Sequence, residues 1–200
     1  MHNIKDIYHG KKVLITGHTG FKGSWLSMWL TKLGADVIGI SHSVPTNPSN
    51  FVVSNVSKKI QDYRANIMDL ENLTSIIDEH NPDFIFHLAA QALVYDAYKN
   101  PIKTLTENAI GSENVLEAIR LVNKPLIAVM ITSDKAYDNV EWAWGYRETD
   151  PLGGIDPYSA SKAMAELAIK TYVNSYFKNP KDGVRIGITR AGNVIGGGDW

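Results

Sequence analysis

The chain carries a glycine-rich loop, Gly17-His18-Thr19-Gly20-Phe21-Lys22-Gly23, between an apolar run at 12–16 and a segment of helical periodicity at 21–33. Gly17 permits a tight turn, Gly20 lets the backbone approach a pyrophosphate, and Gly23 lets a helix pack closely on a sheet. Free N–H groups at the start of that helix would face the phosphate charge. A glycine turn that binds nothing is the alternative, but a strand before the loop and a helix after it favour a dinucleotide site. The residues expected to form this site are Gly17, Thr19, Gly20, Phe21, Lys22 and Gly23.

Along the rest of the chain, short β-branched runs alternate with longer helical segments, a pattern typical of repeated βαβ units. Asp69 is a candidate N-cap for the helix at 69–81, and Gly34 is expected to end the helix at 21–33. Pro101 and Pro157 suit the first turns of the helices that begin there. The sequence therefore predicts one α/β domain with a doubly wound, Rossmann-like parallel sheet. We expect strands at 12–16, 36–40, 60–67, 84–88, 126–132 and 184–189, helices at 21–33, 69–81, 101–122 and 157–177, and a loop at 41–50.

The composition is that of a globular domain, since 44% of the 200 residues are hydrophobic and 20% are charged. Twenty basic and 21 acidic residues give a net charge of −1, which argues against nucleic acid or an anionic membrane as the partner. No cysteine is present, so cysteine nucleophiles are excluded and a reducing compartment, the cytoplasm, is the expected location. The six histidines show no metal-ligand spacing, so no metal site is expected, and His87 is expected to be packed at a strand end. No apolar stretch approaches the length of a membrane span.

The end of the second expected strand does not identify the dinucleotide. An acidic residue there usually holds the adenosine ribose, whereas this chain has Ser41-His42-Ser43. No arginine stands there to accept a 2′-phosphate, although Lys22 could approach one. We expect NAD, with NADP left open. Asn66 and Ile67, at the end of the third expected strand, either contact the adenine or simply pack there.

Two groups of polar residues are candidates for catalysis. Tyr158 and Lys162 lie one helical turn apart, and a neighbouring ammonium can favour the phenolate form of a tyrosine base. Ser133, Asp134 and Lys135 follow the fifth strand, at the sheet edge where open α/β folds bind ligands. Each group alone could be a solvated helix face or an ordinary turn. Their co-occurrence favours one catalytic site formed by all five residues.

Longer motifs resemble the extended short-chain dehydrogenase/reductases. These motifs are the glycine loop, His87-Leu88-Ala89-Ala90-Gln91, Thr106-Glu107-Asn108 and Asp156-Pro157-Tyr158-Ser159-Ala160-Ser161-Lys162. Within that superfamily the chain is similar to the sugar-nucleotide 4,6-dehydratases, in particular to the branch acting on CDP-glucose, through the stretches 132–135, 142–148, 150–154 and 190–200. Lys135 stands where the related dTDP-glucose branch has glutamate, which favours the cytidylyl branch.

The resemblance implies an NAD-dependent dehydration of a nucleotide-sugar without net redox change. Tyr158, held by Lys162, would take the proton of the glucose C4 hydroxyl, to which Ser133 would hydrogen-bond. Lys135 would remove the C5 proton, for which it must be neutral through burial or the nearby Lys162, and Asp134 would protonate the leaving C6 hydroxyl. The resemblance also places Leu88, Ala89 and Ala90 at the cofactor and Gln91, Asn108, Arg190 and Asn193 at the substrate.

Two positions depart from the family pattern. Asn66 replaces the aspartate usual in the adenine-binding pair, and Tyr95 stands where arginine is frequent. Trp142, Trp144 and Tyr146 either form a lid over the sugar site or cover an apolar flank.

The resemblance makes residues 1–190 the dinucleotide-binding and catalytic domain and residues 191–200 the start of a substrate-binding region whose larger part is missing. We therefore expect this chain to bind cofactor with little turnover by itself, because it lacks remote binding energy for the substrate. The helices that begin at Pro101 and Pro157 resemble the family's dimer-forming pair, so a homodimer or higher homo-oligomer is expected. An epimerase or dehydrogenase of the superfamily, or a non-catalytic dinucleotide-binding protein, is the alternative; none of these uses an acid and a base at Asp134 and Lys135.

Overall fold

The structure is a computed structural model that describes residues 3–179 and 183–200. In this part of the chain, six strands form one parallel sheet in the order β3-β2-β1-β4-β5-β6. The order reverses between β1 and β4, which makes the carboxyl ends of these strands the topological switch point. The predicted doubly wound sheet is confirmed. The strands are β1 (Lys12–Thr16), β2 (Asp36–Ile40), β3 (Gln61–Tyr63), β4 (Phe84–His87), β5 (Leu126–Ile131) and β6 (Val184–Thr189).

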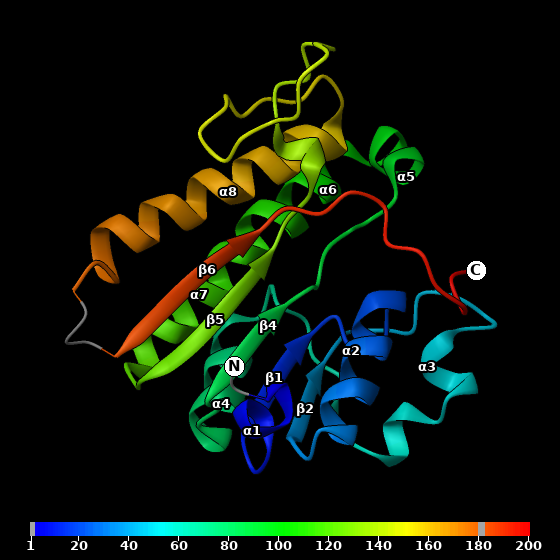
Figure 1. Cartoon of the computed structure of the whole chain (residues 1–200), viewed down its shortest axis with the longest axis vertical. Helices are drawn as coiled ribbons and strands as arrows, with labels where there is room; N and C mark the ends of the chain where they lie inside the picture. Colours follow the sequence, from blue (N-terminus) through cyan, green and yellow to red (C-terminus); the bar gives the residue numbers. More distant parts are fainter. Residues whose placement is uncertain (1–2, 180–182) are drawn as a thin grey trace.

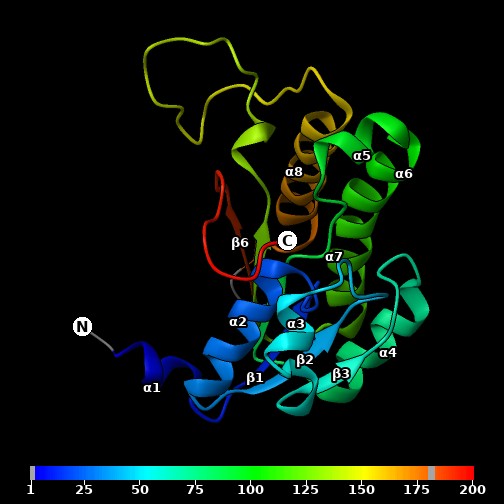
Figure 2. The ribbon, with the colours of Figure 1, turned by 90° about the vertical axis from the view of Figure 1, so that its right-hand side faces the viewer.

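Helices cover both faces of the sheet (Figures 1 and 2). α1 (Ile4–Tyr8) and α2 (Phe21–Lys32) pack on the face of Val13 and Ile15. α4 (Leu70–His80), α7 (Gly111–Val122) and α8 (Pro157–Tyr176) enclose the larger core on the face of Leu14. Val13, Leu14 and Ile15 are 0% exposed, as expected of a central parallel strand buried on both sides. This sandwich holds the carboxyl ends of β1, β4 and β5 together at one edge.

The predicted helix starts are confirmed. The Asp69 side chain accepts a hydrogen bond from the Asn72 N–H and caps α4. Pro101 begins α6 (Pro101–Leu105), and Pro157 begins α8, where Asp156 is the cap. The predicted helix at 101–122 is helical throughout but contains a π turn, Thr106–Ile110, between α6 and α7. Gly34 follows α2 with a φ of +90°, the left-handed conformation that ends a helix.

The third strand is much shorter than the predicted range of 60–67. It ends at Tyr63 because its partner β2 ends at Ile40, and Ala65 and Ile67 then turn into the core beneath α4 and α7. The loop predicted at 41–50 is confirmed, except that its last residue begins the short helix α3 (Asn50–Val53). That helix, α1 and α5 (Val94–Lys99) were not predicted, because four to six residues are too few to show helical periodicity.

Candidate active site

The glycine loop turns sharply at the end of β1. Gly17 has a φ of +77°, and a Cβ on it would lie 2.6 Å from the Ala89 N atom. A Cβ on Gly23 would lie 2.1 Å from the Gly17 carbonyl oxygen, so both glycines are required by close backbone contact. At Gly20 a Cβ would meet its nearest neighbour at 3.4 Å, which is ordinary contact. The face of the loop at Gly20 is therefore open to a ligand.

The start of α2 offers unsatisfied N–H groups beside this open face. Gly20 is the N-cap residue and no side chain caps the helix, so its positive end faces outward. Thr19 is buried and donates a hydrogen bond of 2.7 Å to the Ser43 carbonyl oxygen, which ties the loop to the segment after β2. Phe21 is half-buried and Lys22 is exposed.

The loop after β4 lies against the glycine loop at the switch point, and we refer to the region where these two loops meet as the crevice. Leu88 donates its N–H to the Thr16 carbonyl oxygen, and Ala89 and Ala90 follow it. The buried side chain of Asn108 holds both backbone groups of Gln91, accepting from its N–H at 2.7 Å and donating to its carbonyl oxygen at 3.0 Å. Asn108 therefore reaches the crevice through Gln91, and a direct contact with substrate would need this clamp to open.

Tyr158 and Lys162 lie together on α8, with the Lys162 Nζ 5.9 Å from the centre of the Tyr158 ring. Lys162 is 7% exposed, which excludes a solvated helix face. Burial lowers the pKa of Lys162 to about 8, with a smaller contribution from the positive charge of Lys22. Burial raises the pKa of Tyr158, whereas the Ser133 hydroxyl acts in the opposite direction. Lys162 thus carries its charge at neutral pH beside the phenol.

Ser133, Asp134 and Lys135 follow β5 in a tight turn. Ser133 is buried, accepts a hydrogen bond from the Lys135 N–H and donates one of 3.1 Å to Asp134 Oδ1. Asp134 also donates its N–H to the Ala191 carbonyl oxygen, which joins this turn to the segment after β6. Asp134 and Lys135 are exposed, so of the two influences considered for keeping Lys135 neutral, burial and the nearby Lys162, this fold does not supply burial.

Arg190 has a partner that the sequence did not predict. Its guanidinium forms two hydrogen bonds with the carboxylate of Glu166, which is fully buried on α8 and also accepts a 2.7 Å hydrogen bond from Thr132. The guanidinium also lies 4.4 Å from the centre of the Tyr137 ring. Glu166 stands at the spacing of Tyr158 and Lys162 on the same helix face, and this charged residue at an inward position was the available signal.

The remaining predicted residues lie at the rim. Asn66 is exposed and its side chain accepts from the Met68 N–H, whereas Ile67 is buried in the core with α7. Asn193 is exposed in the tail after β6, which runs across the strand ends toward α2 and α3 (Figure 1). There the Trp25 indole N–H donates a 2.9 Å hydrogen bond to the Gly197 carbonyl oxygen.

The segment at 138–152, which carries Trp142, Trp144 and Tyr146, extends away from the sheet (Figure 2). The rings of Tyr146 and Tyr137 are stacked with their centres 4.9 Å apart, and the ring centres of Trp142 and Tyr146 are 5.4 Å apart. Trp144 is 76% exposed. Among the described residues, no group of three metal-ligating side chains occurs and no helix is long and apolar enough to cross a membrane.

A doubly wound sheet with a glycine loop at its switch point and a tyrosine-lysine pair on the adjoining helix defines the class of short-chain dehydrogenase/reductase domains. Similar solved structures belong to the same class. The UDP-glucose 4-epimerase of Thermotoga maritima has a TM-score of 0.78 and 27% identity over 92% of this chain and 56% of that one. The UDP-glucose 4-epimerase of Thermus thermophilus, solved as a complex with NAD, has a TM-score of 0.75 and 28% identity over 90% and 54% of the two chains.

Comparison of sequences identifies the family within this class to which the chain belongs. The family model described as GDP-mannose 4,6 dehydratase matches residues 14–179, so the chain belongs to this family. It is 48% identical to the CDP-glucose 4,6-dehydratase of Salmonella typhimurium over 98% of this chain and 55% of that relative. It is 31% identical to the GDP-mannose 4,6-dehydratase of Vibrio cholerae over 83% of this chain and 46% of that relative. The chain thus spans about half the length of these relatives.

Proposed function

We propose that this chain supplies the cofactor-binding and catalytic part of an NAD-dependent enzyme that converts CDP-glucose to CDP-4-keto-6-deoxyglucose. The observation that carries the proposal is the meeting of Ser133, Asp134 and Lys135 with Tyr158 and Lys162 at one sheet edge, in a chain 48% identical to a CDP-glucose 4,6-dehydratase. An alcohol oxidation needs only the tyrosine-lysine pair. A subsequent elimination of water also needs an acid and a base.

The residues of the crevice fit a dinucleotide. The uncapped start of α2 suits a pyrophosphate, and the open face at Gly20 lets the phosphate oxygens approach the backbone. When bound, the nicotinamide accepts a hydride from the sugar and returns it. Ser41 at the end of β2 supplies neither an acidic partner for the ribose nor an arginine for a 2′-phosphate, so this position does not separate NAD from NADP. We assign NAD because the similar Thermus thermophilus structure is a complex with NAD, and a comparison of NAD and NADP binding tests the assignment.

The first chemical role belongs to Tyr158. Its phenol would take the proton of the C4 hydroxyl, while the nearby Ser133 hydroxyl would hydrogen-bond the same oxygen. Burial raises the pKa of Tyr158 and the Ser133 hydroxyl lowers it. The Lys162 ammonium, buried on the same helix, is the positive charge that we assign to favouring the phenolate when substrate is bound. The C4 alcohol becomes a ketone, and that ketone acidifies the hydrogen at C5.

The second role belongs to Asp134 and Lys135. Lys135, as the neutral amine, would remove the C5 proton, and Asp134, as the acid, would give a proton to the departing C6 hydroxyl. One water leaves, hydride returns to C6 and a proton to C5, so the overall change is loss of water. Both side chains are exposed, and substrate binding would remove water from them.

On the substrate side, Gln91 and Asn193 are the residues we assign to the nucleotide-sugar. Gln91 Oε1 is buried without a hydrogen-bond partner at the crevice wall, an acceptor that a sugar hydroxyl would satisfy. Asn108 would act through the Gln91 backbone. Arg190 would fix the end of β6 to α8 through its ion pair with Glu166. As a second role, we assign to it a contact with a phosphate of the nucleotide-sugar.

A product assay on CDP-glucose tests this function with the full-length protein. We expect a product lighter than the substrate by one water and no net change in NAD. A product of unchanged mass would identify an epimerase, and stoichiometric NADH would identify a dehydrogenase. Cofactor binding without any product would leave only a dinucleotide-binding protein.

Two glycine substitutions separate cofactor binding from folding. Gly20→Ala should weaken NADH binding about tenfold or more and leave the unfolding midpoint unchanged, since the nearest protein atom to its Cβ is the Gly17 carbonyl oxygen at 3.4 Å. Gly23→Ala should lower the free energy of unfolding by about 1–3 kcal/mol, because its Cβ would overlap the Gly17 carbonyl. Fluorescence titration and thermal unfolding measure the two effects. Unchanged NADH affinity in Gly20→Ala would remove the pyrophosphate from this loop.

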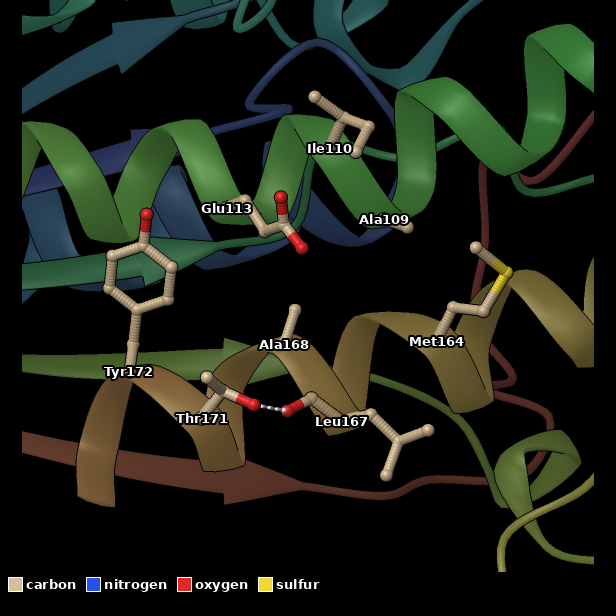
Figure 3. A pocket seen from close by; sticks show the side chains of 8 residues that line it. All are labelled: Ala109, Ile110, Glu113, Met164, Leu167, Ala168, Thr171 and Tyr172. Atoms are coloured by element: carbon tan, nitrogen blue, oxygen red, sulfur yellow. Dashed lines mark hydrogen bonds between the residues drawn. The ribbon is translucent and has the colours of Figure 1, made fainter. Parts of the chain in front are cut away.

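We also propose that α7 and α8 form a homodimer interface. An apolar groove runs between them (Figure 3), and beside it Ile110, Met164 and Leu167 are 41–56% exposed. Pairing two copies would remove this apolar surface from water. Light scattering should give the mass of a dimer, and Leu167→Glu should shift it toward the monomer. A wild-type chain that is monomeric at micromolar concentration would exclude this interface.

A further inference from the structure

His87 lies at the switch point of the sheet, where the last residues of β1 and β4 meet. It is 3% exposed and stands opposite Thr16 in the register of the two strands. Its Nδ1 is 2.7 Å from Thr16 Oγ1 and its Nε2 is 3.0 Å from Ser112 Oγ on α7. Both ring nitrogens are therefore engaged, in contacts that link three elements.

The neighbouring groups determine which ring nitrogen carries the proton. Ser112 uses its single hydroxyl proton in a 2.7 Å hydrogen bond to the Asn108 carbonyl oxygen, which can only accept. Its oxygen must therefore accept from His87, so Nε2 carries the proton. At the other end, the Ala89 N–H donates to Thr16 Oγ1 at 3.2 Å, which leaves the Thr16 hydroxyl proton for Nδ1. The hydrogen bonds thus run in one direction, from Thr16 through His87 and Ser112 to the Asn108 carbonyl.

The charge state required by this chain of hydrogen bonds agrees with the surroundings of the ring. Burial lowers the pKa of His87 to about 3, and the nearby positive charge of Lys162 adds to the effect. The imidazole is neutral throughout the physiological range, so one tautomer persists. Lys162 remains the charged group beside Tyr158.

Both ends of this series of hydrogen bonds lie at groups that form the candidate site. At one end, Ala89 N is the atom that a Cβ on Gly17 would strike, so the hydrogen bond from Ala89 to Thr16 lies where the glycine loop meets the loop after β4. At the other end, Asn108 belongs to the π turn, and its amide holds Gln91 and donates a 2.8 Å hydrogen bond to Ser161.

The linkage then continues into the catalytic helix. Ser161 is fully buried and donates to the Tyr158 carbonyl oxygen at 2.6 Å. The cofactor crevice and the first turn of α8 are thereby connected through consecutive hydrogen bonds that are buried or part-buried. Such a network fixes relative positions only while every member is satisfied.

We propose that His87 is a positioning residue that keeps the glycine-loop end of β1 and the Asn108 turn in one fixed register. The imidazole acts as a rigid spacer, accepting from Thr16 and donating to Ser112. Its loss would let the crevice walls and the tyrosine helix move relative to each other. The effect on cofactor rests on the function proposed above, whereas the tautomer does not.

The test compares two replacements of the imidazole. Glutamine carries one donor and one acceptor and can restore both contacts, whereas leucine restores neither. His87→Leu should weaken NADH binding at least tenfold, and His87→Gln should stay within about threefold of the wild type. Thr74→Val is the matched control, because it removes a hydroxyl bonded to the Leu70 carbonyl on α4 and should leave affinity unchanged. Circular dichroism verifies that each variant is folded, and Ser112→Ala replaces His87→Leu if that variant is unfolded, with a loss of at least threefold expected.

The tautomer is measured directly by nitrogen NMR of labelled histidine. Protonated Nε2 and unprotonated Nδ1 are expected for His87, with no titration between pH 5 and 9. The opposite tautomer, or equal NADH affinity in the wild type and the folded leucine variant, would overturn the role of His87. A wild-type protein that binds no dinucleotide would instead overturn the proposed function.

Discussion

Tyr158→Phe should reduce the rate of cofactor reduction by about 10²- to 10⁴-fold when the full-length protein is mixed with CDP-glucose. The substitution removes only the phenolic hydroxyl, the group that would accept the C4 proton. The helix start remains intact, because Asp156 caps it through the backbone N–H groups of residues 158 and 159. Stopped-flow absorbance of NADH measures the rate.

Tyr172→Phe provides a control on the same helix. The phenol of Tyr172 lies 3.2 Å from a Glu117 carboxylate oxygen, away from the catalytic turn, so the rate should remain near that of the wild type. Normal cofactor reduction by Tyr158→Phe would show that another group accepts the proton.

Lys135→Ala should separate the second chemical step from the first. Oxidation at C4 would proceed, but removal of the C5 proton would slow by a comparable factor of about 10²- to 10⁴-fold. Enzyme-bound NADH should therefore accumulate after mixing, whereas the wild type returns the hydride and shows little. Because Lys135 is exposed, its truncation should leave stability unchanged.

Lys11→Ala offers a comparison for Lys135→Ala, since Lys11 is another exposed lysine and its ion pair with Asp83 lies at the amino end of β1. This variant should behave as the wild type. An equal loss of cofactor reduction in Lys135→Ala and Tyr158→Phe would mean that Lys135 positions the sugar instead of removing its proton.

The sheet was predictable because its central strands are apolar on both faces and are separated by strong turn signals. All six expected strands are present in one parallel sheet, and the glycine loop lies where the strand-turn-helix pattern placed it. The length of β3 was not predictable, because apolar residues beyond Tyr63 enter the core as a loop and not as part of the ladder. Local sequence does not distinguish these two ways of burying Ala65 and Ile67.

The candidate site was predictable in its residue types but not in its connections. The spacing of Tyr158 and Lys162 indicated a shared helix face, yet the burial of Lys162 and the exposure of Lys135 depend on how α8 and the turn after β5 pack. The partner of Arg190 is Glu166, on a different element, and only the tertiary fold reveals it. His87 was expected to be packed, and it is, but its two hydrogen-bond partners come from distant parts of the chain.

The most direct measurement for the whole account follows one atom through the reaction. CDP-glucose carrying deuterium at C4 is converted by the full-length protein, and the product is analysed by mass spectrometry and NMR. If the site carries out an intramolecular dehydration, the deuterium will be found at C6 of the same sugar, with no net NADH formed. Loss of the deuterium from the sugar, or NADH formed in proportion to product, would contradict the dehydratase assignment.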